Sequence, residues 1–137
     1  MNPEVTQLVQ ESWAKVTPIA SQAAALFYGN LFTLDPSLKP LFQGDMEEQG
    51  KRLMEMIGTA VQKLNNIETV VPVLQGLGRR HVRYGVKEEH YQTVGAALLT
   101  TLSQGLGEHF TPQVKEAWTL VYGVMADVMI KAAYHNA

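Results

Sequence analysis

The sequence predicts an all-α protein. Apolar residues recur three and four positions apart through most of the 137 residues, as they do on the buried face of a helix. Alternation with a period of two is absent, and so are hairpin dipeptides such as Asn-Gly, which would indicate strands. Pairs of a capping residue and a proline favour helix starts at four places: Asn2-Pro3, Thr17-Pro18, Asp35-Pro36 and Thr111-Pro112.

The first half of the chain is expected to form three helices. The first covers about residues 3–17 and the second about 18–34. A short helical turn from Pro36 then leads to Leu41-Phe42. The tetrapeptide Asp45-Met-Glu-Glu48 is a capping box that opens the third helix. The stripe of this helix contains Leu53, Met56, Ile57, Ala60, Val61 and Leu64, and Asn65-Asn66 ends it.

Three more helices are expected in the second half. The next one carries His81, and Pro72 lies in its early part, so either the helix starts there or its first turn is broken. Gly85 occupies the position that glycine favours after a last helical turn. Helices over about residues 88–105 and 112–133 follow, the first of them closed by Gly105-Leu-Gly107.

Composition limits the kinds of protein that this chain can be. A length of 137 residues with 46% hydrophobic residues predicts a single domain over 1–137 with a real core. The chain has no cysteine, which excludes disulfides, thiolate metal sites and covalent c-type haem. The polar N-terminus does not resemble a secretion signal, and the apolar stretch 117–130 is too short to span a bilayer. A net charge of −2 without a basic stripe makes nucleic acid an improbable partner. We therefore expect a soluble cytoplasmic protein, monomeric or weakly dimeric.

One imidazole projects from an otherwise apolar helical stripe. His81 shares that face with Leu74, Leu77, Gly78 and Tyr84. It is either a core histidine with satisfied hydrogen bonds or an axial ligand to the metal of a large cofactor. A di-iron site needs Glu-x-x-His pairs and a zinc site needs several close ligands, and the sequence around the four histidines offers neither. Haem requires one protein ligand, an apolar slot and a few cationic side chains.

Six motifs follow one another along the chain: Phe27-Tyr28-x-Asn-Leu-Phe32, Pro40-Leu-Phe42, Glu48-Gln49, Leu77-Gly-Arg-Arg-His81-x-x-x-Gly-Val86, Tyr91-x-x-Val94-Gly and Ala117-Trp118-x-x-x-Tyr122-Gly. This ordered set resembles the globin family, and above all single-domain bacterial haemoglobins and neuroglobins. No single motif is specific, but together they cover nearly the whole chain in the family's order. The resemblance implies a globin fold of about six to eight helices around a haem pocket.

The resemblance also implies a set of haem contacts. His81 would be the proximal ligand of haem b, neutral, with one ring nitrogen on the iron and the other donating to the Leu77 carbonyl. Phe42 resembles the phenylalanine that wedges the haem. Arg52 and Arg80 are candidates for pairing with the haem propionates, although either could be an ordinary solvated charge. The residues expected to line the proximal and edge surfaces are Leu77, Val86, Tyr91, Val94 and Leu98.

On the distal side, Tyr28 and Gln49 match positions that contact a bound gas, and Leu53 matches an apolar gate. Each donor to bound dioxygen would contribute roughly 1.5–3 kcal/mol. Two donors would slow dioxygen release about a hundredfold or more. Tyr28 could instead be a core tyrosine bonded to a carbonyl. A shift of one residue would put Glu48 or Gly50 in place of Gln49.

The sequence departs from two relatives in ways that bear on chemistry. Neuroglobins have a second histidine ligand where Gln49 stands. Because an amide binds iron poorly, we expect a five-coordinate ferrous haem here. Flavohaemoglobins have a glutamate on the last helix that, with a tyrosine like Tyr91, polarises the proximal histidine. The matching position here is Ala133, so a peroxidase-like push on bound oxygen is not expected.

Three functions follow from these expectations. The first is reversible, tight binding of dioxygen and of other diatomic gases such as nitric oxide and carbon monoxide, with slow dioxygen release. The second is a nitric oxide dioxygenase. No flavin or nicotinamide domain is recognised in these residues, so that enzyme would rely on a separate reductase. The third is an interaction or sensor module with a globin fold that has lost haem, which the intact His81 face and Phe42 disfavour.

Overall fold

A computed structural model gives the arrangement of the chain and describes residues 2–42, 44–83 and 85–135. The described part is helical, with no strand among these residues. In chain order the elements are α1 (Pro3–Val16), η1 (Thr17–Ile19), α2 (Ala20–Leu34), η2 (Pro36–Leu41), α3 (Met46–Gln62), η3 (Leu64–Thr69), α4 (Val71–Arg83), α5 (His90–Leu106), η4 (Gly107–His109), α6 (Pro112–Ile130) and η5 (Lys131–His135). The all-α prediction is confirmed. Tyr84, expected on the face of His81, lies outside the described residues.

The predicted helix starts are mostly correct because their caps are local. The side chains of Asn2, Asp35, Asp45 and Thr111 each accept a hydrogen bond from the backbone N–H of the second or third residue of the following helix. The second helix was predicted two residues too early. Thr17–Ile19 form a tighter 3-10 turn, and the α-helix begins at Ala20. The last helix also ends earlier than expected, at Ile130, where a wider π-helical turn follows.

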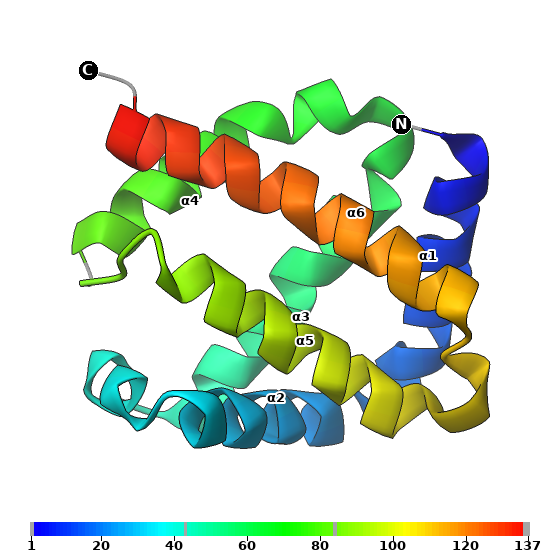
Figure 1. Ribbon diagram of the computed structural model, residues 1–137, viewed down its shortest axis with the longest axis horizontal. Helices are drawn as coiled ribbons and strands as arrows, with labels where there is room; N and C mark the ends of the chain where they lie inside the picture. Colours follow the sequence, from blue (N-terminus) through cyan, green and yellow to red (C-terminus); the bar gives the residue numbers. More distant parts are fainter. Residues whose placement is uncertain (1, 43, 84, 136–137) are drawn as a thin grey trace.

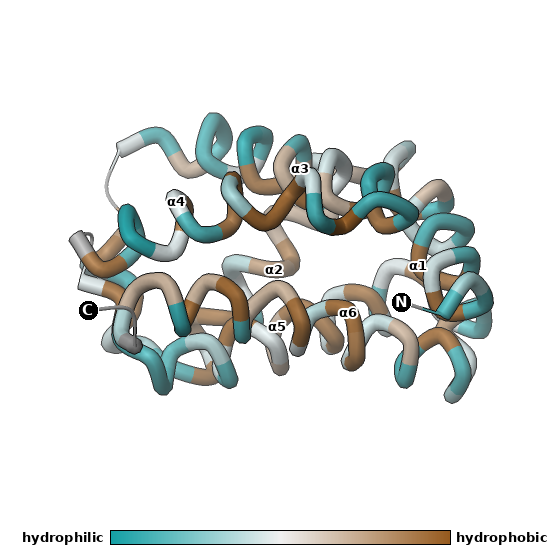
Figure 2. Tube along the Cα trace, turned by 90° about the horizontal axis from the view of Figure 1, so that it is seen from above, coloured by the Kyte–Doolittle hydropathy of each residue, from teal (hydrophilic) through white to brown (hydrophobic). Residues whose placement is uncertain are grey.

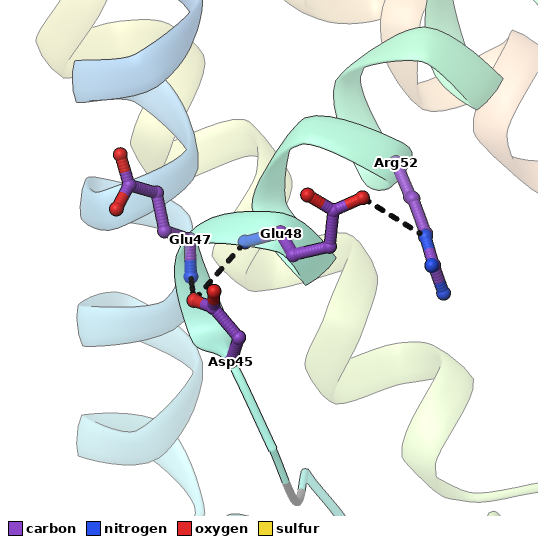
Figure 3. Close-up of polar contacts among 4 residues, drawn as sticks. All are labelled: Asp45, Glu47, Glu48 and Arg52. Atoms are coloured by element: carbon purple, nitrogen blue, oxygen red, sulfur yellow. Dashed lines mark hydrogen bonds and ion pairs between the residues drawn. The ribbon is translucent and has the colours of Figure 1, made fainter.

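The capping box at α3 forms only in part. The Asp45 carboxylate accepts from the backbone N–H groups of Glu47 (3.0 Å) and Glu48 (3.4 Å) (Figure 3). The Glu48 carboxylate, which a complete box would return to Asp45, instead pairs with Arg52 one turn further along (3.5 Å). The cap therefore fixes the start of α3, and Glu48 faces solvent.

Helices far apart in sequence pack across one another to form the core. α2 packs against α5 and α3, whereas α6 packs against α4 and α1 (Figure 1). In Figure 2, α3 and α4 lie on one side of the molecule, and α5 and α6 on the other. Trp118 is fully buried at the α1–α6 crossing, where its Nε1–H donates to the Ser12 hydroxyl (2.8 Å). This bond satisfies a polar group that burial would otherwise make costly.

None of the helices in the described ranges combines the length and the apolar character that crossing a bilayer requires.

Gly78 allows α4 to lie directly on α6. A Cβ at Gly78 would stand 2.5 Å from the Met129 carbonyl oxygen, so the two backbones could not keep this spacing. Gly78→Ala is therefore expected to lower the free energy of unfolding by about 1–3 kcal/mol. Gly76 on the same helix has open space around it. Gly76→Ala should stabilise the helix by up to about 1 kcal/mol. Denaturant unfolding of both variants measures the contrast, and equal effects would show that the close crossing is unimportant.

Candidate cofactor-binding site

An apolar cavity lies among α2, α3, α4, α5 and α6. Its volume is about 180 Å³, and nearly all of its wall is apolar. Nine of the twelve predicted site residues line it: Tyr28, Phe42, Leu53, Leu77, His81, Val86, Tyr91, Val94 and Leu98. The remaining three, Gln49, Arg52 and Arg80, are not among the lining residues.

His81 brings an imidazole to this cavity from the inner face of α4. Its Nδ1 lies 2.8 Å from the Leu77 carbonyl oxygen one turn back, as predicted from the sequence. A carbonyl only accepts, so Nδ1 carries the proton and the lone pair is on Nε2. Burial lowers the pKa of His81. The hydrogen bond to Leu77 opposes that effect, and Arg80 adds to it. The ring is therefore held neutral, in the tautomer that a metal ligand requires.

The end of the His81 helix is fixed by the chain that follows it. The backbone N–H of Val86 donates to the His81 carbonyl (3.0 Å), and Gly85 takes a positive φ of 93° there. This is the glycine stop predicted from the sequence. The Tyr134 hydroxyl donates to the Val86 carbonyl, which ties the C-terminal turn to the same corner.

Tyr28 presents a hydroxyl with no hydrogen-bond partner among the described residues, although the residue is only 9% exposed. No backbone carbonyl in the described ranges accepts from this hydroxyl, and the role of Tyr28 toward a bound gas stays a prediction. Burial raises the pKa of Tyr28, so the phenol remains a neutral donor at physiological pH. Its ring is held by neighbouring aromatic rings, with centroids 5.4 Å from Phe27, 6.1 Å from Phe32 and 5.5 Å from Phe42.

Phe42 lies at the end of η2 and joins this aromatic cluster at the cavity wall. Its ring meets Phe32 edge-on at 5.4 Å and Tyr28 edge-on at 5.5 Å. Such pairs contribute about 0.5–1.5 kcal/mol each beyond the area they bury. Phe42 is thus both a packed aromatic residue and a lining residue, and its predicted contact with a haem stays a prediction.

The register of α3 near Gln49 follows from its neighbours. Gly50 faces α2, because a Cβ there would stand 2.9 Å from the Ala24 Cβ. Glu48 points to solvent, and Leu53 lines the cavity. Gln49 is half-buried, with its Nε2 3.9 Å from where a Cβ at Gly44 would stand. The amide therefore lies toward the segment before α3 in this conformation.

The two arginines predicted to meet propionates are both exposed. Arg52 is paired with Glu48, and its side chain is 75% exposed. Arg80 lies on the outward side of α4, although its charge is close enough to affect the His81 pKa. Their role toward a cofactor stays a prediction.

Tyr91 places a second hydroxyl in the wall, on the α5 side. The hydroxyl oxygen is buried and has no hydrogen-bond partner among the described residues, so it has donor capacity left for what the cavity holds. The Tyr122 hydroxyl donates to the Tyr91 carbonyl (2.6 Å). The Tyr122 ring packs against Gly95, because a Cβ at Gly95 would stand only 2.7 Å from the Cε2 atom of Tyr122. Ala133, at the position that matches the last-helix glutamate of flavohaemoglobins, is half-buried on η5.

Raising the pH above about 10 is expected to destabilise the fold. Burial, with a smaller effect of Tyr134, raises the pKa of Tyr91 to about 12, and burial also raises the pKa of Tyr122. In the unfolded chain both ionise near pH 10. Between about pH 10 and 12 the folded chain therefore binds more protons, so the free energy of unfolding falls as pH rises. Denaturant unfolding of the haem-free protein at pH 8 and pH 11 measures this loss. Tyr91→Phe should lose less than the wild type, and an equal loss would contradict the assignment.

Sequence reasoning missed several lining residues. Met56, Ile57 and Ala60 were on a recognised apolar stripe, but a stripe does not tell cavity wall from filled core. Trp118 and Tyr122 were likewise seen only as parts of motifs. His90, the second histidine at the cavity, had no pattern of its own, because it sits at the first position of α5 beside Tyr91.

Comparison with known proteins decides the family. Residues 25–129 match the sequence model of the globin family. The chain belongs to the globin family. This globin is 28% identical over 133 residues to a flavohemoprotein of Bordetella parapertussis, covering 95% of this chain and 33% of that protein. It is 32% identical over 107 residues to a flavohemoprotein of Vibrio cholerae, covering 76% of this chain and 27% of that protein. The globin thus spans about a third or less of the length of these curated relatives.

A solved structure agrees in fold over nearly its whole length. The bacterial globin from Campylobacter jejuni has a TM-score of 0.82 and 28% identity, covering 96% of this chain and 95% of that chain. The predicted globin fold and the resemblance to single-domain bacterial globins are confirmed. Membership of this family and the similarity to flavohemoproteins imply haem as the cofactor.

The residues present fit a haem. The cavity walls are apolar, one imidazole has its proton set on Nδ1, and the buried Tyr91 hydroxyl is unpartnered within the described part of the chain. Among the described residues no three His, Asp or Glu side chains gather to hold a bare metal ion. A metal held here by one protein ligand would need a cofactor to supply the others.

Proposed function

We propose that His81 is the proximal ligand of haem b in this globin and that Tyr28 is the principal donor to a bound gas, dioxygen first among them. A bound haem supplies an iron atom that coordinates diatomic gases reversibly. The observation that carries the proposal is the pairing, in one apolar cavity, of a neutral imidazole fixed by Leu77 with a phenol from another helix that has no hydrogen-bond partner in the described ranges of the chain.

His81, the apolar walls and Tyr28 have different roles in the proposed function. His81 offers Nε2 to the iron, and the Leu77 carbonyl keeps the ring in one orientation and strengthens its basicity. The apolar walls, with Leu53 and Phe42 among them, exclude water and so strengthen every hydrogen bond made inside. Tyr28 donates to a ligand that carries partial negative charge, which a neutral phenol does well.

Gln49 is proposed as the second donor. Its amide lies toward Gly44 in this conformation, so it must rotate about its own side-chain bonds to reach the cavity. Rotamer changes of exposed side chains take picoseconds to nanoseconds, and Gln49 is partly exposed near the start of α3. Gln49 therefore acts as a donor recruited by the ligand, and Tyr28 as the one already in place.

Titration of the purified protein with haemin tests this function. Haemin should bind in a ratio of one per chain and give a Soret band. After reduction, the protein should bind carbon monoxide and dioxygen. A protein that fails to take up haemin would contradict the proposal and would favour a haem-free interaction module.

The second candidate function is nitric oxide dioxygenase activity supported by a separate reductase. The similarity to flavohemoproteins supports it. Their name joins flavin and haem, and this chain covers only about a third or less of the length of each of these proteins. Re-reduction of the ferric protein by a cell extract with NADH, in the absence of oxygen, distinguishes the candidates. Fast re-reduction supports turnover, whereas negligible re-reduction leaves reversible gas binding as the function.

A further inference from the structure

A second histidine stands at the cavity, and none of the roles assigned so far uses it. His90 is the first residue of α5 and lines the same cavity as His81. Its Nδ1 accepts a hydrogen bond from the backbone N–H of Lys87 (3.0 Å), and that bond is exposed to solvent. One ring thus touches both the apolar interior and water, which places it where the cavity meets solvent.

The Lys87 contact also decides which ring nitrogen carries the proton. A nitrogen that accepts from a backbone N–H must have its lone pair there, so in the neutral ring Nδ1 is unprotonated and Nε2 carries the hydrogen. Nε2–H is therefore a donor, and it has no protein acceptor among the described residues. The nearby Asp35 carboxylate is engaged locally, accepting from the Ser37 hydroxyl (2.5 Å) and the Ser37 backbone N–H (3.1 Å).

Haem is amphipathic, and its two carboxylates must stay at the boundary between pocket and water. Burying an unpaired carboxylate is costly, so they need donors at the mouth of the cavity and not deep inside. Arg52 and Arg80 do not line the cavity, and Arg52 is paired with Glu48. The Tyr91 hydroxyl is buried. Among the lining residues of the described ranges, His90 joins donor capacity with contact to solvent.

We propose that His90 holds a haem carboxylate at the mouth of the cavity through its Nε2–H. The inference rests on the proposed function, because it needs the haem to occupy this cavity. His90 is then an anchoring residue that slows haem loss, and it takes no part in coordinating the iron. The hydrogen bond from the Lys87 backbone N–H already orients the His90 ring, so His90 loses little conformational freedom when the carboxylate binds.

The experiment measures the rate at which haem leaves the protein, using an excess of an apoglobin as acceptor. Two cofactors are compared: haemin, and haemin dimethyl ester, whose carboxylates are blocked. His90→Phe keeps the ring's bulk and removes the donor, whereas His90→Gln retains a donor near the position of Nε2. His109→Phe is the matched control, because His109 is exposed and does not line the cavity.

His90→Phe should speed the loss of haemin about tenfold and leave the loss of the dimethyl ester within about twofold of the wild type. His90→Gln should recover most of the difference, and His109→Phe should match the wild type. Equal acceleration for both cofactors would show that His90 only packs, and an unchanged haemin rate would show no contact; either overturns the proposal. If the wild type itself takes up no haemin, the proposed function fails as well.

Discussion

Replacing His81 by glycine is expected to abolish stable haem binding, with a loss of affinity well above about a hundredfold. Removing a residue that merely orients a metal ligand typically costs about 10- to 100-fold, and His81 is proposed to be the ligand itself. The glycine leaves a space the size of an imidazole beside the Leu77 carbonyl. Added imidazole is therefore expected to restore haem binding and the spectrum. Haem content after gel filtration, with and without imidazole, is the measurement.

Two controls separate coordination from folding in the His81 experiment. Circular dichroism of the haem-free variant should match that of the haem-free wild type, since His81 is only half-buried. His109→Gly, which changes an exposed histidine away from the cavity, should retain haem like the wild type. A His81→Gly protein that keeps its haem and its spectrum without imidazole would refute the assignment.

Replacing Tyr28 by phenylalanine is expected to speed dioxygen dissociation about 10- to 100-fold. The change removes one donor to a partly charged ligand, worth about 1.5–3 kcal/mol, and each 1.36 kcal/mol is a factor of ten. The ring remains, so its contacts with Phe27, Phe32 and Phe42 are preserved. Displacement of dioxygen by excess carbon monoxide in a stopped-flow instrument measures the rate.

Tyr122→Phe is the matched control for Tyr28. Tyr122 also lines the cavity, but its hydroxyl already donates to the Tyr91 carbonyl (2.6 Å) and so is not available to a ligand. Its loss should change the dioxygen rate by less than about threefold. Tyr28→Phe with an unchanged rate would leave Gln49 as the distal donor, and equal effects of the two changes would point to general disturbance of the cavity.

The fold could be predicted from the sequence where the signal is local. Asn2 and Thr111 cap the helices that they were expected to cap, and Gly85 and Gly107 take positive φ angles at helix ends. The start of α2 was predicted two residues early, because a proline at 18 suits a 3-10 turn as well as an α-helix. The π turn after Ile130 had no signal, since it depends on how the C-terminal residues pack against α4.

The site residues, too, could be predicted from the sequence only where the signal is local. Leu77, His81, Val94 and Leu98 lie on helical stripes, so their presence at one cavity followed from periodicity and resemblance together. The direction of the Gln49 amide depends on the segment before α3, which helical periodicity does not describe. The place of His90 depends on where the start of α5 meets the cavity, which only the folded arrangement reveals.

The absorption spectrum of the reduced, ligand-free protein tests the central claim most directly. A haem iron held by His81 and open on the side of Tyr28 should give the broad visible band of a five-coordinate ferrous haem. That band should sharpen and the Soret band should shift when carbon monoxide is added. A sharp, split six-coordinate spectrum before any gas is added would contradict the account, because it would require a second protein ligand where we place an open site.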